Sequence, residues 1–158
     1  MEITFRRGKP SDIEAIKSFI LFHGPNQWNH LPVSWLEQHV KLIASGQVQA
    51  AMAETGGKLC GVTTFFTGYA SKFSLGENYP SDLYPDEWTK KKVGYIAEVV
   101  VSKDLAGKGI GSRLLERAKE WFCESQVPAV YAKRHEENLA SKGMLRKAGF
   151  IDIATFED

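Results

Sequence analysis

The feature that most constrains this sequence lies between Val93 and Phe122, where a strand, a glycine-rich turn and a helix follow one another. Residues 93–101 are β-branched and aromatic over the length of one strand, and a polar stretch ends them. Three glycines at alternate positions come next, at 107, 109 and 111, and the helix after them repeats apolar residues at helical spacing. The chain is therefore expected to start a helix soon after a strand.

Such a helix start can bind an anion. The first four backbone N–H groups of a helix have no partner inside it, and the aligned peptide dipoles place roughly half a positive charge there. Glycines let a phosphate approach closely because they carry no Cβ. Lys108 and Ser112 add an ammonium group and a hydroxyl at the same edge. We interpret the turn as a cradle for a pyrophosphate.

Two other phosphate-binding motifs do not match this turn. A P-loop needs Gly-x-x-x-x-Gly-Lys-Ser/Thr, whereas Lys108 is followed by Gly109. A dinucleotide-binding fingerprint needs Gly-x-Gly-x-x-Gly in an early βαβ unit. The spacing here is Gly-x-Gly-x-Gly, and it occurs late in the chain.

The turn and its surroundings resemble the GNAT superfamily of N-acetyltransferases, which bind acetyl-CoA through Arg/Gln-x-x-Gly-x-Gly/Ala. The motif reads AGKGIG at residues 106–111, so that Ala106 stands at the Arg/Gln position. A second family element, an asparagine followed by Gly-Phe, is found as Asn138 and residues 149–150. The opening ITFRRGKPSDIEAI also resembles the first strand and helix of the family.

The resemblance implies an α/β (α+β) fold, with a mixed, mostly antiparallel sheet flanked by helices in one domain over residues 1–158. The patterns predict strands at 2–7, 47–54, 59–67, 93–101, 129–133 and 151–156. They predict helices after a Ser11 capping box, from Pro32, from Ile110 and from Asn138. Gly143 lies inside the last of these, where we expect packing to hold it. The chain stops too soon for the family's usual further strand, so either the sheet ends early or a homodimer completes it.

Bulk properties exclude several classes of function. Twenty basic and nineteen acidic residues give a net charge of +1, without the basic excess typical of nucleic-acid binding. The sequence shows neither a membrane span nor a signal peptide, so we expect a cytoplasmic protein without membrane or nucleic-acid partners. The four histidines lack metal-ligand spacing, and the two cysteines are expected to be reduced thiols. No metal is predicted.

The family's reaction is direct attack by an amine on the thioester of acetyl-CoA. By resemblance, the pantetheine arm lies beside the backbone of Val99, Val100 and Val101, where strands four and five separate. A backbone N–H near Val99 is then expected to polarise the acetyl carbonyl. The diphosphate is expected at Ala106, Gly107, Lys108, Gly109, Ile110, Gly111 and Ser112. Asn138 is expected to cap its helix and contact the CoA arm, which Ser141 could also reach.

Glu98 is the candidate base, because it is a carboxylate within an otherwise apolar strand. A charge there is costly to bury unless it is paired or faces a wet cleft. Several enzymes of the family that acetylate small amines have an acidic residue at this place. The alternative is that Glu98 forms an ordinary salt bridge on the strand, and both interpretations stay open at this point.

The general acid is less defined, because the family's usual tyrosine position holds Leu145. Tyr131, Ser141 or a water molecule could donate the proton instead. For the acceptor site we expect contributions from Trp28, in the segment 23–30, and from His135. The segment 69–92 is either a lid over that site or an aromatic-rich loop on the sheet edge.

Four acidic residues of that segment hint at a cationic acceptor, a small-molecule or peptide amine: Glu77, Asp82, Asp86 and Glu87. The sequence thus predicts an acetyl-CoA-dependent N-acetyltransferase. A rival hypothesis is a non-catalytic acyl-CoA-binding sensor or regulator with the same fold. It is motivated by the departures from the family pattern at Ala106 and Leu145.

Overall fold

A five-stranded sheet with helices on both faces forms the framework of the computed structural model, which describes residues 2–26, 31–69, 92–134 and 137–152. The strands are β1 (Thr4–Arg7), β2 (Gln49–Thr55), β3 (Lys58–Tyr69), β4 (Lys92–Val101) and β5 (Val130–Ala132). The α-helices are α1 (Ile13–His23), α2 (Val33–Ala44), α3 (Ile110–Glu124) and α4 (Leu139–Lys147). Two short 3-10 helices are η1 (Pro10–Asp12) and η4 (Lys103–Leu105).

The strands lie in chain order, β1-β2-β3-β4-β5. Neighbouring strands are antiparallel except for β4 and β5, which are parallel. β4 and β5 can be parallel because α3 lies between them in the chain. This helix returns the chain to the end of the sheet at which β4 begins, so that β5 runs in the same direction. The expected mixed, mostly antiparallel α/β fold is therefore confirmed.

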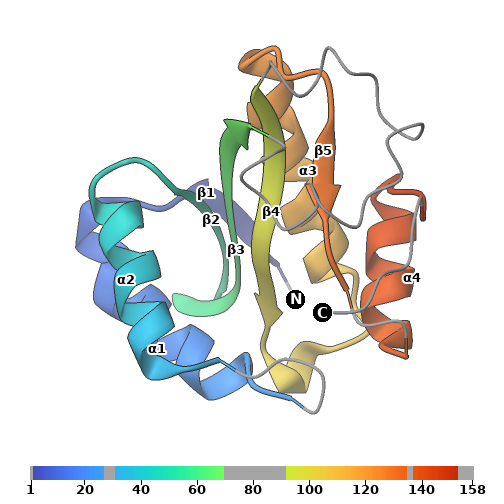
Figure 1. Cartoon of the computed structure of the whole chain (residues 1–158). Coiled ribbons are helices and arrows are strands. Elements are labelled where there is room, and N and C mark those ends of the chain that lie inside the picture. Colours follow the sequence, from blue (N-terminus) through green and yellow to red (C-terminus); the bar gives the residue numbers. More distant parts are fainter. Residues whose placement is uncertain (1, 27–30, 70–91, 135–136, 153–158) are drawn as a thin grey trace.

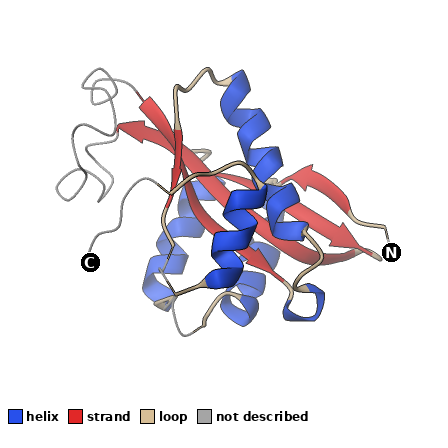
Figure 2. Ribbon diagram, turned by 90° about the vertical axis from the view of Figure 1, so that its right-hand side faces the viewer, coloured by secondary structure: helices blue, strands red, loops and turns tan. Residues whose placement is uncertain are grey.

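Each face of the sheet has its own hydrophobic core. α1 and α2 cover one face, and their core includes Ile16, Leu36 and Val100. α3 covers the other face with α4 beside it, and this core includes Leu114 and Phe122. Figure 1 shows the two helix pairs on opposite sides of the strands, and Figure 2 turns the α3 and α4 side toward the viewer.

The start of α1 differs from the expected Ser11 capping box. Residues 10–12 form η1, and α1 begins after it with Asp12 at its N-cap position. The carboxylate of Asp12 accepts a hydrogen bond from the main-chain N–H of Lys9 at 2.7 Å. The prediction failed because Pro10 suits the first position of a tight helical turn, which moves the start of α1 past Ser11.

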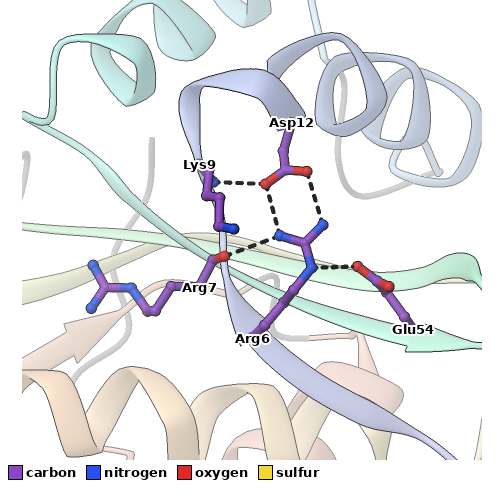
Figure 3. A network of polar contacts seen from close by, with 5 residues as sticks. All are labelled: Arg6, Arg7, Lys9, Asp12 and Glu54. Carbon is purple, nitrogen blue, oxygen red and sulfur yellow. Dashed lines mark hydrogen bonds and ion pairs between the residues drawn. The ribbon is translucent and has the colours of Figure 1, made fainter.

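An ion-pair network ties this segment to the sheet (Figure 3). The Arg6 guanidinium contacts the Asp12 carboxylate through two nitrogens at 2.8 Å, and Glu54 through Nε at 2.6 Å. These hydrogen bonds lower the pKa of Asp12 to about 2. The network therefore joins β1, η1 and β2 at one point.

Two expectations about the end of the chain have different outcomes. Among the described residues, nothing lies within 4 Å of a Cβ added to Gly143, so packing does not hold that glycine in place. The expected last strand at 151–156 lies mostly outside the described residues, and Ile151 and Asp152 are not in a strand.

Among the helices in the described ranges, none is both long and apolar enough to cross a membrane.

Candidate functional site

The candidate site lies where β4 and β5 stop pairing. The two strands are in register at Gly94 with Val130, Tyr95 with Tyr131, and Ile96 with Ala132. β4 then continues to Val101, whereas β5 ends at Ala132. The second half of β4 is thus left without a sheet partner on that side in the described ladders.

A β-bulge in β4 sits at the beginning of this gap. Phe65 of β3 pairs with Ile96 and Thr64 pairs with Glu98, so Ala97 is an extra residue. A bulge reverses the alternation of side chains along a strand. Tyr95 and Glu98 consequently share one face of the sheet, although three positions separate them.

Cross-strand neighbours show that this shared face is the one covered by α1 and α2. Phe66 packs against the core beneath those helices, and its ring lies 5.4 Å from that of Tyr95. Thr64, opposite Glu98, contacts His39 of α2. The bulge therefore turns the Glu98 side chain toward α2.

A cavity of about 1290 Å³ is lined by residues along the gap and on both of its sides. Trp35 and His39 of α2 line it on one side, and α4 lines it on the other. The sequence-predicted residues that it brings together are Glu98, Val99, Val100, Val101, Ala106, Asn138 and Ser141. It is thus open both to the exposed edge of β4 and to the start of α4.

The glycine-rich turn follows directly after Ala106. Gly107 and Gly109 have φ angles of 80° and 78°, a left-handed conformation that favours glycine. Gly109 is the N-cap residue of α3, and the N–H of Arg113 donates to its carbonyl at 3.1 Å. The N–H groups of residues 110–112 precede that first helical bond and therefore have no partner within the helix. Residues 107–112 adjoin the cavity through Ala106 but do not line it themselves.

Two residues of the expected phosphate cradle, Gly111 and Ser112, contact α4 instead. A Cβ at Gly111 would overlap the sulfur of Met144, so glycine leaves room for the Met144 side chain between α4 and α3. Ser112 is buried, and its hydroxyl donates to the main-chain carbonyl of Met144 at 3.1 Å. The Ser112 hydroxyl is therefore used in helix packing and is not at the edge of the turn, which corrects the expectation for its side chain.

The start of α4 agrees with the sequence interpretation. Asn138 is the N-cap residue, and its Oδ1 accepts a hydrogen bond from the Ser141 N–H at 3.1 Å. Leu145, at the usual tyrosine position of the resembling family, lines the cavity and packs against the core on the α3 face. The wall of the cavity at that point is apolar.

The structure describes one of the three remaining predicted residues, and that residue does not line the cavity. Tyr131 is 8% exposed and is not among the cavity-lining residues. Trp28 and His135 lie outside the described residues, as do residues 70–91 of the predicted lid. His23, Gly24 and Asn26 line the cavity, in agreement with the expectation that the segment 23–30 borders it.

Sequence reasoning missed two residues of α2. His39 is 6% exposed, and its Nε2 lies 2.8 Å from the Thr64 hydroxyl. The Trp35 indole, which is 40% exposed, stacks on the imidazole with ring centroids 4.7 Å apart. Burial lowers the pKa of His39 to about 4, so the ring is neutral near pH 7. The i, i+4 spacing of Trp35 and His39 was a signal that they share a helix face.

The cavity also has lining residues that follow β5, namely Lys133 and Arg134. They lie at the end of the predicted strand 129–133 and directly after it, a place where functional side chains often lie. Tyr95 was missed for a different reason, because a bulge that changes its face leaves no mark in the hydrophobic pattern.

A family model described as the acetyltransferase (GNAT) family matches residues 17–150. A search of curated proteins gave no significant match.

Several solved structures share the fold. AAC(6')-Iy, in complex with the bisubstrate analogue CoA-S-monomethyl-acetylneamine, has a TM-score of 0.74 at 12% identity, covering 100% of this chain and 99% of that one. Aminoglycoside 6'-N-acetyltransferase AAC(6')-Ih from Acinetobacter baumannii has a TM-score of 0.68 at 14% identity, covering 99% and 98%. Ribosomal-protein-alanine N-acetyltransferase from Brucella melitensis biovar Abortus 2308 has a TM-score of 0.67 at 15% identity, with the same coverage.

Proposed function

This chain belongs to the GNAT family of acetyltransferases, and we propose that it transfers the acetyl group of acetyl-CoA to a primary amine by direct attack. The observation that carries this proposal is the single cavity that joins the exposed edge of β4, the Glu98 side chain and the start of α4. An acyl donor and an amine need such an arrangement, because the two must meet beside a base.

The residues around the gap suit acetyl-CoA. The main-chain N–H groups of 107–112, with the exposed ammonium of Lys108, would hold the diphosphate. The edge of β4 at Val99–Val101 offers peptide groups to the amides of the pantetheine arm. Asn138 and Ser141 line the same cavity from α4. Acetyl-CoA supplies the activated acyl group, and its thiolate leaves when the amine attacks the carbonyl carbon.

The main chain of β4 would stabilise the charge that develops on the acetyl oxygen. We assign this role to the Val99 N–H, which lies beyond the last paired residue of β5. A fixed donor of this kind acts mainly in the transition state, where it contributes about 3 kcal/mol.

The amine needs a base more than the thiolate needs an acid. An alkylamine of pKa about 10.4 costs roughly 4 to 5 kcal/mol to deprotonate at pH 7. A thiolate of pKa about 8.5 costs roughly 2 kcal/mol. We therefore assign Glu98 to bind and deprotonate the amine, directly or through water. With Leu145 in the cavity wall, Ser141 or a water molecule would protonate the thiolate.

For the acceptor we propose a small or peptide-borne cationic amine. Glu98 supplies a carboxylate to the cavity, and the half-exposed Trp35 indole supplies an aromatic face. Cations are attracted to both groups. The names of the similar structures include aminoglycoside and ribosomal-protein acetyltransferases, which makes both kinds of amine suitable for a first screen.

Calorimetry with acetyl-CoA, combined with release of free thiol over a panel of amines, tests this function. We expect binding of acetyl-CoA and amine-dependent thiol release. The departures at Ala106 and Leu145 favour one alternative, a non-catalytic acyl-CoA-binding protein. Binding without thiol release from any amine would support that alternative and contradict the enzyme proposal.

A further inference from the structure

Thr63 makes an uncommon contact at the centre of the sheet. Its side chain is 0% exposed, and its Oγ1 donates a hydrogen bond to the main-chain carbonyl of Glu98 at 2.8 Å. Thr63 lies on β3 and is the register partner of Val99. The hydroxyl therefore crosses from one strand to the peptide group that joins Glu98 to Val99 on the next strand.

Together with the pairing of β3 and β4, this hydrogen bond fixes which way that peptide group points. No cis peptide bond occurs among the described residues, and in a trans peptide the carbonyl and the N–H point in opposite directions. Because the Glu98 oxygen is held by a residue of β3, the Val99 N–H points away from β3. The pairing of β5 has already ended at Ile96, so this N–H points into the gap that the cavity follows.

The position of the bond explains why a hydroxyl is useful there. The bulge at Ala97 interrupts the regular ladder immediately before this peptide, so the ladder alone constrains it less. Donation to a carbonyl also polarises the peptide group and strengthens its N–H as a donor. A valine would fill the same space without either effect.

We propose that Thr63 is a positioning residue that orients and polarises the 98–99 peptide, so that the Val99 N–H acts as the oxyanion donor. The proposal rests on the acetyl transfer proposed above. Thr63 does not touch the reacting atoms, and it acts through the peptide group alone.

The neighbouring Thr64 provides a matched control. It is also 0% exposed, but its hydroxyl contacts His39 on the opposite face of the sheet. Thr64→Val therefore removes a buried hydroxyl from the same strand without removing the bond to the Glu98 carbonyl. Thr63→Val removes that bond at nearly constant volume, and Thr63→Ser keeps the donor.

The test measures the carbonyl stretch of acetyl-CoA labelled with ¹³C at the acetyl carbonyl and bound without any amine. We expect a shift to lower wavenumber in the wild type, loss of at least half of it in Thr63→Val, and recovery in Thr63→Ser. Thr64→Val should keep the shift. With an amine present, kcat of Thr63→Val should fall about tenfold to a hundredfold with an unchanged amine KM.

The outcomes separate this proposal from the proposed function. An unchanged shift and an unchanged kcat in a folded Thr63→Val would overturn the role of Thr63 and leave acetyl transfer intact. If Thr63→Val does not fold, Thr63→Cys gives the same comparison with a weak donor and should show an intermediate shift. A wild type that does not bind acetyl-CoA would overturn both proposals, because the spectroscopic measurement needs binding but no turnover.

Discussion

At the scale of single residues, one extra residue in a strand selects the side chains that reach the site. Without the bulge at Ala97, the side chains of Tyr95 and Glu98 would lie on opposite faces of the sheet. With it, both line the cavity on the side of α2. Glu98 is thereby placed where an amine can approach it.

Glu98→Gln tests the proposed base. We expect turnover at pH 7 to fall by about 10² to 10⁴, because the protonated amine then lacks an acceptor for its proton. At pH 9 the loss should be smaller, since more of the amine is already neutral. Affinity for acetyl-CoA, measured by calorimetry, should stay within about twofold. An unchanged rate at pH 7 would remove Glu98 from the mechanism.

His39 gives a prediction about stability and pH. Its pKa is about 4 in the folded chain, below the ordinary 6.5, because burial disfavours the charged ring. Between pH 6.5 and 4 the unfolded chain therefore binds more protons than the folded chain. As the pH is lowered from 6.5 to 4, the free energy of unfolding should fall by on the order of 3 kcal/mol. His39→Gln can keep a contact with Thr64 but cannot titrate, so its unfolding free energy should fall less. Parallel curves for the two proteins would contradict this assignment.

Single residues also show where sequence reasoning succeeds and fails. The place of Glu98 in the cavity was predictable because a carboxylate in an apolar strand is unusual, and the Asn138 cap because N-cap chemistry is local. The role of Glu98 as a base stays a prediction. Tyr95 and His39 were not, since their positions depend on a bulge and on the packing of α2 over β3. The expected role of the Ser112 hydroxyl was wrong because only the structure reveals the nearby carbonyl of Met144.

At the scale of elements, the contact between α3 and α4 connects the glycine-rich turn with the start of α4. Gly111 and Ser112 of α3 both meet Met144 of α4. Since Asn138 caps α4 and Ser141 lies in it, this contact would set the distance between the proposed diphosphate site and the far wall of the cavity.

Two glycine substitutions test that contact. Gly111→Ala should lower the free energy of unfolding by roughly 1 kcal/mol, because the new methyl group overlaps the Met144 side chain and displaces it from its place against α3. It should also weaken the binding of acetyl-CoA. Gly143→Ala, a control on an open face of α4, should instead raise stability by roughly 0.5 to 1 kcal/mol. Denaturant unfolding measures both, and changes of the same sign would be inconsistent with this packing.

The ion-pair network at the start of α1 gives a second element-scale prediction. Hydrogen bonds from Arg6 hold the pKa of Asp12 at about 2, below the ordinary 3.8. The stabilisation is complete above pH 3.8 and disappears as the pH falls through 2. Asp12→Asn should therefore cost about 1 kcal/mol at neutral pH, after allowance for screening of a partly exposed pair, and nothing near pH 2.

A control comes from the same part of the chain. Glu14→Gln removes a nearby carboxylate that forms no ion pair with any of the described residues, and it should change stability by only a few tenths of a kcal/mol. Unfolding free energies measured from pH 2 to 7 compare the two variants. A constant difference between Asp12→Asn and the wild type over this range would disprove the linkage.

The order of elements was largely predictable, and their ends were not. Hydrophobic periodicity and glycine-containing turns placed the five described strands and four α-helices. The start of α1 was misplaced because Pro10 begins a separate 3-10 turn over residues 10–12, which moves the start of the helix past Ser11. Whether another strand or a second subunit completes the sheet stays a prediction.

At the scale of the whole molecule, one sheet carries two cores, and the gap between β4 and β5 connects its two faces. In the proposed function, an acyl donor enters beside α3 and α4, and an acceptor approaches from the side of α2. The fold agrees with that of the family to which the chain belongs. The acceptor itself is selected by side chains, which the shared fold does not specify.

The most direct test of this account is a crystal structure of the chain with coenzyme A. We expect the diphosphate within about 3 Å of main-chain nitrogens in residues 107–112, and the pantetheine arm beside Val99–Val101 in the gap next to β5. Coenzyme A bound elsewhere, with the first turn of α3 making no contact to phosphate, would contradict the account.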